Sequence, residues 1–288
     1  MYDLMIVGSG PAGVSAALSA RARGLDFIWF GSRRLSEKLE KAEKILNYPG
    51  LSSVTGVQFR DALLSQIEAL EIVICEERVV SLYQMEGTYA ACTEKGFYES
   101  RCVLLATGVV GGSEIPGESR FMGRGVSCCA TCDGDLYKDK RIAVICTAPS
   151  LCDEIFFLAR LARSVELFTS FPWETAHCSN VIYHQGKPQR IEGSVRADAV
   201  ICGEKRIEVD GVFCLRESIS PATLLPGIEM ENGHVRVDRG QQTSLQGCFA
   251  AGDCTGRPYQ YAKAVGEGNV ALHSVLAYLK EWTEKKEK

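Results

Sequence analysis

The stretch LMIVGSGPAGVSAA, residues 4–17, decides the fold of this chain. It begins with a short apolar run that is typical of a buried parallel strand, and it ends in an alanine-rich segment that is typical of a helix. Between the two, Gly8, Gly10 and Gly13 have the spacing of a dinucleotide-binding loop. The first glycine permits the tight turn, the second lets the backbone approach a pyrophosphate, and the third allows close helix packing. The N-terminus of the helix then faces the phosphates.

Strand and helix signals alternate through the rest of the chain, and the strand–turn–helix pattern restarts at residues 142–163. We therefore predict an α/β protein with two nucleotide-binding, Rossmann-like, three-layer ββα domains, the second inserted into the first. The first domain takes residues 1–112 and 218–288, and the second takes residues 113–217. The expected strands are 4–7, 27–30, 73–75, 79–84, 89–93, 96–100, 103–106, 142–145 and 165–168, and the expected helices are 14–23, 36–45, 56–70, 153–163 and a long closing helix.

Composition excludes several classes of function. With 288 residues, of which 46% are hydrophobic and 24% charged, we expect a soluble globular protein with a sizeable core. A net charge of −4 gives no general attraction to nucleic acid or to an anionic membrane surface. We expect neither a signal peptide nor a membrane span. Because most of the 13 cysteines lie in apolar, strand-like runs, we expect reduced thiols and a cytoplasmic protein.

The segment CCATCDG, residues 128–134, carries the chemistry. Two residues separate Cys129 from Cys132, so a turn that leads into a helix can hold them at disulfide distance, and a helix N-terminus lowers the thiol pKa for exchange. A zinc half-site and a chance pair in a cysteine-rich chain are the alternatives. Zinc needs two further ligands, and the sequence has neither another close cysteine pair nor clustered histidines. The pattern favours a redox-active disulfide and no metal site.

A second dinucleotide signal lies near the end of the chain. CFAAGDCTG, residues 248–256, resembles the second FAD fingerprint of flavoproteins with two dinucleotide domains. In such proteins an aspartate holds the ribityl chain, and Asp253 matches it, although this carboxylate can also be a helix N-cap. LLATG, residues 104–108, resembles the chain crossover of the same fold. Gly31 stands where an acidic residue is expected after the second strand, so the ribose would need backbone contacts or the neighbouring serine.

The chain resembles the low-molecular-weight thioredoxin reductases over most of its length. The resemblance implies a homodimer, FAD in the outer domain and a disulfide in the inner domain that faces the isoalloxazine ring. It also implies a domain rotation that offers the disulfide in turn to FAD and to thioredoxin. The motifs that carry it are GSGPAG at 8–13, KAEKILNYPG at 41–50, LLATG at 104–108, GRGVSCCATCDG at 123–134, FAAGD at 249–253 and YAKAVGEGNVA at 261–271.

The same resemblance implies roles for individual residues. Cys132 is the thiol closer to the flavin, Cys129 is its partner, and Asp133 donates or accepts the proton. Cys128 stands where the family has a non-cysteine residue, so it is either a bystander or a site of disulfide shuffling. Gln260 begins a pair that replaces the usual Arg-Gln. The expected FAD-binding residues are Gly8, Ser9, Gly10, Pro11, Ala12, Gly13, Gly31, Ser32, Asn47, Val79, Ala106, Thr107, Gly108, Gly252, Asp253, Tyr261 and Ala262.

Two motifs with which this family binds NADPH are missing from the sequence. Where GxGxxA would bind the pyrophosphate, residues 146–151 offer no glycine, and a proline removes one backbone donor. Where HRRxxxR would bind the 2′-phosphate, residues 169–175 read TSFPWET, without an arginine. Phe171 and Trp173 are either core residues or side chains that fill the vacant site.

These losses resemble the ferredoxin-dependent flavin thioredoxin reductases, which lack both nucleotide motifs and take electrons from reduced ferredoxin. We therefore expect an enzyme that passes electrons from ferredoxin through FAD and the Cys129–Cys132 disulfide to thioredoxin. An NAD(P)H-dependent reductase with an atypical nucleotide site and a non-catalytic flavoprotein redox sensor are the alternatives. Because ferredoxin is acidic, we expect a basic surface on which it docks. Glutamates alternate with the candidate basic residues, which is also typical of a solvated helix. The candidates are Arg33, Arg34, Lys38, Lys41 and Lys44.

Overall fold

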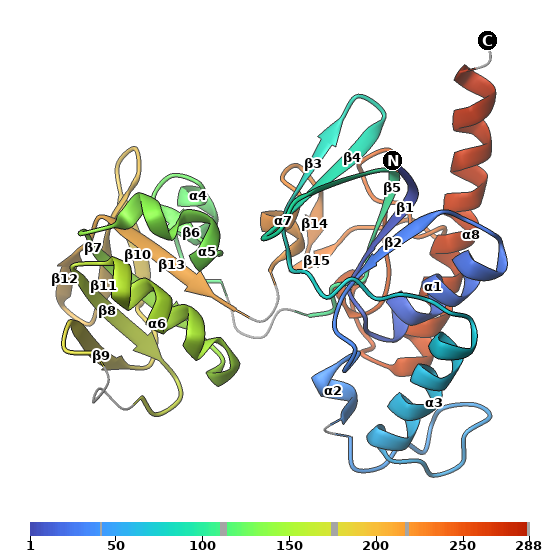
Figure 1. Cartoon of the computed structure of the whole chain (residues 1–288), viewed down its shortest axis with the longest axis horizontal. Coiled ribbons are helices and arrows are strands. Elements are labelled where there is room, and N and C mark those ends of the chain that lie inside the picture. The colour runs from blue at the N-terminus through green and yellow to red at the C-terminus, as the bar shows by residue number, and fades with distance from the viewer. Residues whose placement is uncertain (41, 110–113, 174–177, 217–218, 287–288) are drawn as a thin grey trace. The chain divides into compact units, whose positions relative to one another are not determined.

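The computed structural model describes residues 1–40, 42–109, 114–173, 178–216 and 219–286, without the side chains of Glu37, Lys38, Cys132, Lys285 and Lys286. The chain divides into two compact units: the first unit is Met1–Val109 with Ser220–Lys288, and the second unit is Val110–Ile219 (Figure 1). Both units combine strands with helices, which confirms the predicted α/β class. The expected domain boundaries at 112/113 and 217/218 fall outside the described residues and stay a prediction.

The first unit is built on a sheet whose parallel strands lead into the glycine loop. β1 pairs in parallel with β2 and β5, and β16 also pairs in parallel with β5. β3 and β4 extend the sheet in antiparallel fashion, so that the order is β2-β1-β5-β4-β3. Leu4, Met5 and Ile6 of β1 are fully buried, as expected for a strand that is covered on both faces. These strands are β1 (Tyr2–Val7), β2 (Phe27–Phe30), β3 (Val79–Met85), β4 (Thr88–Thr93), β5 (Phe97–Leu105) and β16 (Cys248–Ala250).

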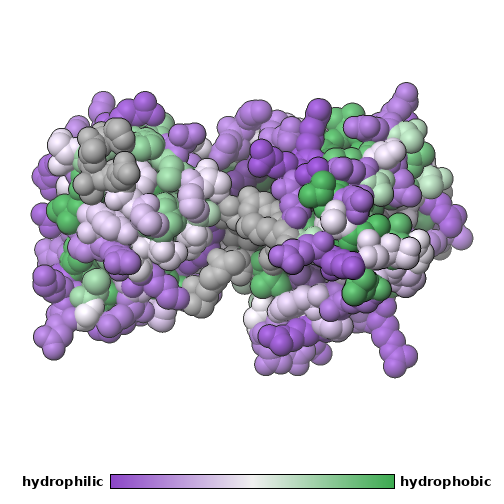
Figure 2. Space-filling model, turned by 90° about the horizontal axis from the view of Figure 1, so that it is seen from below, coloured by the Kyte–Doolittle hydropathy of each residue, from purple (hydrophilic) through white to green (hydrophobic). Residues whose placement is uncertain are grey.

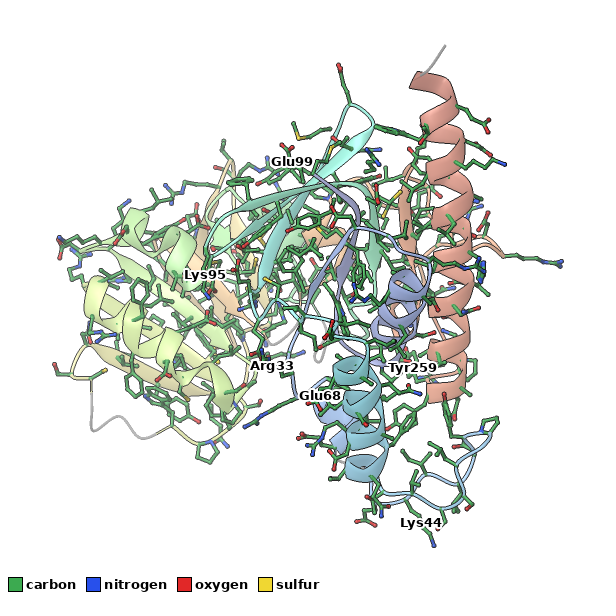
Figure 3. All side chains as sticks on the ribbon, turned by 45° about the vertical axis from the view of Figure 1, so that its right-hand side comes forward. Arg33, Lys44, Glu68, Lys95, Glu99 and Tyr259 are labelled. Carbon is green, nitrogen blue, oxygen red and sulfur yellow. The ribbon has the colours of Figure 1, made fainter. Side chains whose placement is uncertain are left out.

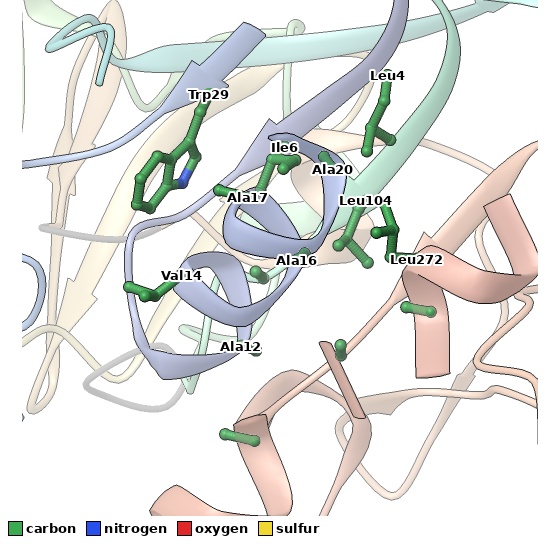
Figure 4. Packing of buried hydrophobic residues seen from close by; sticks show 14 of the residues in the cluster. Leu4, Ile6, Ala12, Val14, Ala16, Ala17, Ala20, Trp29, Leu104 and Leu272 are labelled. Atoms are coloured by element: carbon green, nitrogen blue, oxygen red, sulfur yellow. The ribbon is translucent and has the colours of Figure 1, made fainter. Parts of the chain in front are cut away.

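Two helices of the first unit pack closely against each other. α1 (Pro11–Ala22) and α8 (Tyr261–Lys286) lie side by side in Figure 1. Small residues allow the approach, because an added Cβ at Gly268 would overlap the Ala12 carbonyl oxygen. Ala12 and Leu272 belong to one buried cluster, part of which is drawn in Figure 4. The other elements of this unit are α2 (Glu37–Glu40), α3 (Gly56–Ala69), α7 (Pro221–Leu224), β14 (Met230–Glu231) and β15 (His234–Val235).

The helix expected at residues 36–45 is wrong in length. Among the described residues of this segment only α2 is helical. Ile45 instead forms an antiparallel bridge with Val54, and the Ala42 carbonyl accepts a 2.8 Å hydrogen bond from the Gly56 N–H. These contacts with the following segment replace the hydrogen bonds that would extend the helix.

Two strand predictions in the first unit also need correction. The strands expected at 96–100 and 103–106 are one strand, β5, because Ser100 already pairs with Tyr2 of β1 and the ladder continues without a break to Leu105. Residues 73–75 form no strand, and Cys75 makes a single bridge to Phe30. Ser100 pairs with Tyr89 of β4 on one side of β5 and with Tyr2 of β1 on the other side, so the two expected strands are joined at this residue.

The second unit has three layers, as predicted. Its strands and helices are β6 (Val126–Ser127), β7 (Arg141–Cys146), β8 (Ser164–Thr169), β9 (Val181–Gln185), β10 (Arg190–Gly193), β11 (Ala197–Cys202), β12 (Lys205–Glu208), β13 (Gly211–Leu215), α4 (Glu118–Phe121), α5 (Ala130–Asp133) and α6 (Cys152–Leu161). A parallel sheet in the order β6-β13-β7-β8-β9 forms the centre. Val144 of β7 shares a buried cluster with Leu158 of α6, and Ile145 shares another with Val200 of β11. The helix and the sheet β10-β11-β12 therefore cover opposite faces.

The surface carries no continuous apolar band on the face drawn in Figure 2, where hydrophobic residues are interspersed with hydrophilic ones in both units. No helix in the described ranges is long and apolar enough to cross a membrane. α8 is 26 residues long, and charged side chains such as Lys280 and Glu281 follow one another along it.

Candidate functional site

Three loops of the first unit meet at the carboxyl ends of its parallel strands. Val7 of β1 and Ala250 of β16 both pair with Leu105 of β5, so the loops that follow these strands start side by side. This edge of an open α/β sheet is where ligands bind. The predicted cofactor-binding residues that the three loops bring together are 8–13, 106–108, 252 and 253.

Each glycine of the first loop meets a different local demand. Gly8 has φ +114°, which residues with a side chain rarely adopt. An added Cβ at Gly13 would overlap the Gly8 carbonyl oxygen, which also accepts a 2.9 Å hydrogen bond from Trp29 Nε1. Gly10, in contrast, has no atom within 4 Å of an added Cβ. Its backbone is therefore accessible at the position where a pyrophosphate approaches such a loop.

The N-terminus of α1 suits an anion. Its first turn carries no acidic side chain, and Pro11 occupies the start of the helix, where a missing N–H costs no hydrogen bond. The Val14 N–H bonds back to the Gly10 carbonyl at 3.0 Å, so regular helix begins directly after the loop. The unpaired N–H groups of the first turn and the positive end of the helix dipole both favour a phosphate here.

Ser9 ties the glycine loop to the end of β2. Its hydroxyl donates a 2.9 Å hydrogen bond to the Leu35 carbonyl and accepts one of 2.8 Å from the Ser32 N–H. An added Cβ at Gly31 would overlap the Ser9 side chain. An acidic residue at position 31 would therefore displace Ser9, which explains in packing terms why glycine stands there.

A largely buried ion pair organises the loop at Gly252 and Asp253. Lys263 Nζ donates to the Gly252 carbonyl at 2.9 Å and lies 3.1 Å from Glu267 Oε2. The same carboxylate oxygen accepts a 2.8 Å hydrogen bond from the Gly252 N–H. Sequence reasoning missed both residues. Their i, i+4 spacing on α8 is the signal that could have found them.

Polar and aromatic residues from distant parts of the chain converge near Asp253. Asn47 Nδ2 donates a 2.7 Å hydrogen bond to Gln260 Oε1. The next residue, Tyr261, packs edge-on against Phe59 with ring centroids 5.8 Å apart. Burial, and then the Asp253 carboxylate, raise the pKa of Tyr261. Gln260, which begins the pair that departs from the family's Arg-Gln, is thus linked directly to Asn47.

The first unit fits a flavin dinucleotide on two counts. Gly10 leaves the approach to the loop open. Thr107 Oγ1 is buried, and among the described residues it has no oxygen or nitrogen partner, only the neighbouring Cys254 sulfur. A bound group can therefore supply a hydrogen bond to this hydroxyl. Of the remaining predicted residues, Val79 is buried at the start of β3, and Ala262 is exposed at the start of α8.

The corresponding loop of the second unit is built differently. At the end of β7, the buried Cys146 thiol donates a 3.3 Å hydrogen bond to the Ala148 carbonyl and so closes the turn. Pro149 begins a single 3₁₀ turn, and α6 carries Asp153 and Glu154 in its first turn. Carboxylates at the positive end of a helix stabilise the helix but repel a pyrophosphate. The shape of the loop and the charge of the helix both oppose a dinucleotide.

Phe171 and Trp173 pack against the core of the second unit. Both join the buried cluster that contains residues of α6, and the Trp173 ring lies 5.1 Å from the ring of Phe156. The Phe171 carbonyl accepts a 3.2 Å hydrogen bond from the Tyr183 hydroxyl. These contacts favour the core interpretation of the two aromatic residues. Residues 174–177 lie outside the described part of the chain.

Cys129 is 3% exposed and disulfide-bonded at the entrance to α5. The Ser127 hydroxyl accepts a 3.1 Å hydrogen bond from the Cys129 N–H and lies 3.2 Å from the Cys129 carbonyl oxygen. Cys129 Sγ lies 3.5 Å from Thr131 Oγ1, and the Asp133 N–H reaches the Cys129 carbonyl at 3.4 Å. Sequence reasoning missed Ser127. The Cys132 side chain is outside the described residues, so its pairing with Cys129 stays a prediction.

The end of the disulfide segment is anchored by Tyr137. Its ring packs edge-on against Phe213 of β13, with 5.2 Å between centroids and 80° between planes. It also covers Gly211, where an added Cβ would overlap the ring. Burial raises the pKa of the Tyr137 hydroxyl. The ring therefore fixes the residues that follow α5 against the central sheet of the second unit.

Comparisons with known proteins agree with this arrangement. The family model described as pyridine nucleotide-disulphide oxidoreductase matches residues 2–268. A thioredoxin reductase from Treponema pallidum is 30% identical over 298 residues, which cover 96% of this chain and 97% of that protein. A crystal structure of a ferredoxin-flavin thioredoxin reductase from Clostridium acetobutylicum has 36% identity and a TM-score of 0.89, with 98% of both chains covered. A thioredoxin reductase from Gloeobacter violaceus has 29% identity and a TM-score of 0.77, with 97% of this chain and 94% of that chain covered.

The chain therefore belongs to the pyridine nucleotide-disulphide oxidoreductase family. Within that family it is a flavoprotein disulfide oxidoreductase of the thioredoxin reductase type. The predicted resemblance is confirmed, because solved structures of ferredoxin-flavin thioredoxin reductases align with nearly the whole chain at 36% and 38% identity. The predicted two-domain, Rossmann-like fold is confirmed by the same alignments.

Proposed function

We propose that this enzyme passes electrons from reduced ferredoxin through FAD and the Cys129–Cys132 disulfide to thioredoxin. The contrast between the two nucleotide-type loops carries the proposal. The loop at Gly10 is open, and the helix behind it has no acidic residue in its first turn. The loop at Cys146 is closed by a hydrogen bond from its thiol, and the helix behind it begins with two acidic residues. Only the first loop suits a dinucleotide, and FAD would occupy it. The electron donor must therefore be one that needs no dinucleotide site of its own.

The first unit would hold FAD. Gly8, Gly10, Gly13 and the N-terminus of α1 would take the pyrophosphate, and Asp253 would take the ribityl chain. When bound, FAD supplies the two-electron store that couples a one-electron donor to a disulfide. Lys263 and Glu267 would keep the Gly252 backbone in place beside it, because both hydrogen-bond that residue.

The second unit would supply the disulfide chemistry. Reduction of the disulfide takes up two electrons and two protons and gives two thiols. The Cys129 thiolate then attacks the thioredoxin disulfide, which forms a mixed disulfide and releases one thioredoxin thiolate. The Cys132 thiolate attacks Cys129 Sγ, restores the internal disulfide and releases the second thioredoxin thiolate. Asp133 would move the proton at these sulfurs, and Ser127 would hold the Cys129 backbone.

A protein donor fits the chain better than a nicotinamide. Ferredoxin requires close approach to the flavin but no pocket for a pyrophosphate or a 2′-phosphate. The relative from Clostridium acetobutylicum, 36% identical, is a ferredoxin-flavin thioredoxin reductase, which supports the choice of donor. From the family resemblance we also propose a homodimer, a cytoplasmic location and thioredoxin as the acceptor.

The basic residues considered as a landing surface for ferredoxin do not form one compact group. Arg33 Nε lies 3.5 Å from Glu76 Oε2, and Figure 3 places Lys44 well apart from Arg33. The Lys38 side chain and residue 41 lie outside the described residues. Arg33 and Lys44 therefore do not belong to a single docking surface for the donor.

The test is an anaerobic comparison of electron donors. We expect negligible bleaching of the flavin absorbance by NADPH or NADH, and formation of thioredoxin thiols when reduced ferredoxin is supplied. A Cys129→Ser variant serves as the control, since it should keep flavin reduction and lose thioredoxin reduction. Rapid stoichiometric bleaching by either nucleotide would identify a pyridine-nucleotide reductase instead. Flavin reduction by neither donor, with no dithiol formed, would leave the sensor alternative.

A further inference from the structure

Cys128 directly follows β6, and Cys214 lies in β13, the strand with which β6 pairs. β6 and β13 pair in parallel, and the last pair of their ladder joins Ser127 to Phe213. Continuing this register by one residue places Cys128 beside Cys214. Neighbouring strands lie about 4.8 Å apart. This spacing falls within the roughly 4.4–6.8 Å between Cα atoms that a disulfide spans.

The side chains of the two cysteines belong to the same face of the sheet. Val212 and Cys214 lie in the buried cluster shared with β10 and β11, whereas Phe213 lies in the cluster shared with α6. Val126, two residues before Cys128, lies in the same cluster as Cys214. Cys128 is the first residue after the strand, and continuing the alternation of side chains by this one residue puts it on that face as well. Two thiols thus share one face and one register position.

The two thiols differ in access and in acidity. Cys128 is partly exposed, Cys214 is 1% exposed, and neither is in a disulfide. Burial, and then the Glu118 carboxylate, raise the pKa of Cys214 well above its ordinary value, and the Cys128 sulfur adds to the effect. This influence of one sulfur on the other agrees with the place of Cys128 directly after the ladder. An oxidant from solution would therefore meet Cys128 first.

We propose that Cys128 and Cys214 form a second redox pair, in which hydrogen peroxide oxidises Cys128 and Cys214 then closes a disulfide. The Cys128 sulfur attacks one peroxide oxygen and becomes a sulfenic acid, while the other oxygen leaves as water. The Cys214 sulfur displaces the sulfenic oxygen as a second water. Two thiols lose two electrons in total, and one peroxide is reduced to two waters. A dithiol reverses the bond by exchange.

The new bond would act directly beside the working disulfide. Cys128 precedes Cys129, whose backbone is held by Ser127. A disulfide to Cys214 would tie the first residue of this segment to β13. It would also protect Cys128 from the irreversible oxidation to a sulfinic acid that an isolated sulfenic acid undergoes. The pair is thus a protective site for oxidation that no step of the proposed electron path uses.

Peptide mapping after oxidation tests the pair without any activity assay. The purified protein is reduced, freed of reductant, titrated with hydrogen peroxide, alkylated under denaturing conditions and cut with trypsin. We expect residues 125–138 to be linked to residues 207–216, with the link assigned to Cys128 and Cys214 by fragmentation. Cys214→Ser should lose the link and accumulate the sulfinic acid at Cys128. Cys202→Ser, which removes another partly exposed thiol of the same unit, should keep the link.

Two results would overturn the proposal. In the unmodified sequence, Cys128 recovered as a sulfinic acid together with fully alkylated Cys214 would mean that the two sulfurs do not meet. In a variant with both Cys129→Ser and Cys132→Ser, the link should still form with peroxide. Its disappearance there would mean that it arises by shuffling from the working disulfide and not by direct oxidation.

Discussion

Ser127 holds Cys129 through both ends of its peptide backbone, at 3.1 Å from the nitrogen and 3.2 Å from the carbonyl oxygen. Ser127 is itself 5% exposed, so water does not readily replace its hydroxyl. No sulfur takes part in these two contacts. Removing the hydroxyl therefore tests how the position of the Cys129 backbone affects the disulfide, while both sulfur atoms are left in place.

Replacing Ser127 with alanine should lower the free energy of unfolding by about 1–3 kcal/mol, since a buried N–H loses its partner. We also expect slower dithiol–disulfide exchange with unchanged flavin content, measured by urea unfolding and stopped-flow absorbance. Ser81→Ala is the control, because among the described residues the Ser81 hydroxyl bonds only the exposed Tyr83 hydroxyl, at 3.2 Å. If exchange and stability both stay at their original values, Ser127 has no positioning role.

Gly10→Ala should fold normally and bind FAD roughly tenfold more weakly or worse, a change of about 1.4 kcal/mol. The added methyl meets no protein atom within 4 Å, but it would occupy the approach of the pyrophosphate. Circular dichroism and a fluorescence titration of the apoprotein with FAD would measure the two effects. Gly96→Ala, where an added Cβ also meets nothing, should change neither. Equal FAD affinity in both variants would place the pyrophosphate elsewhere.

Cys132→Ser should abolish thioredoxin reduction and leave FAD bound, because the residues proposed to bind FAD all lie in the first unit. Thioredoxin thiols and the flavin spectrum are the two readouts. Cys128→Ala should keep most of the activity. Flavin loss or continued turnover in the first variant, or an inactive second variant, would show that the working cysteines have been assigned incorrectly.

Asp133→Asn should slow dithiol–disulfide exchange by roughly 10²–10⁴-fold, the usual contribution of a positioned proton donor or acceptor. The reduction of the flavin by its donor should keep its rate, since no thiol proton moves in that step. Rapid-reaction kinetics of the two half-reactions would compare them. Equal slowing of both would indicate a structural role for the carboxylate in α5.

Two buried thiols should make the protein less stable at alkaline pH. Burial raises the pKa of Cys248 from 9.0 to about 12 and that of Cys254 to about 11. Above pH 9.0 these thiols ionise in the unfolded chain while they stay protonated in the folded one. The unfolded state therefore becomes more stable relative to the folded state as the pH rises towards the folded pKa values. Each thiol then removes up to about 1.4 kcal/mol of stability per pH unit.

Urea unfolding at about pH 8 and about pH 10 would measure this loss. The variant with Cys248→Ala and Cys254→Ala should show a smaller decrease between the two pH values than the unmodified chain. An identical pH dependence in both proteins would exclude these thiols as its cause.

Features set by local spacing could be predicted from the sequence. The strand, loop and helix around Gly10 depend on neighbouring residues, and the structure has them within three residues of the expected bounds. Contacts between distant segments were not predictable in the same way. The helix after β2 is short because Ile45 bridges Val54, and β5 is continuous because it meets a different neighbour along each half. Neither partner can be read from the local pattern.

In the candidate site, too, local features could be predicted from the sequence and contacts between distant residues could not. The missing glycines of the second loop were visible in the sequence, whereas the hydrogen bond from Cys146 to Ala148 depends on the path of the folded turn. From the sequence, Lys263 and Glu267 are an ordinary pair on the surface of a helix. In the folded chain both side chains hydrogen-bond the Gly252 backbone. Their role arises from a contact between α8 and the segment that follows β16, and the two are separated by a loop with one short 3₁₀ turn.

The closed turn at Cys146 would make a nicotinamide site difficult to build in the second unit, in evolution or by design. Glycine at position 146 would remove a buried side chain from the core of the second unit, while Asp153 and Glu154 would still repel a phosphate. Neutralising those acids first would weaken the start of α6 and still leave the turn closed. Each single change towards a nicotinamide site therefore loses stability before any binding is gained. Packing, and not the chemistry of the flavin, is therefore what opposes a nicotinamide site in the second unit.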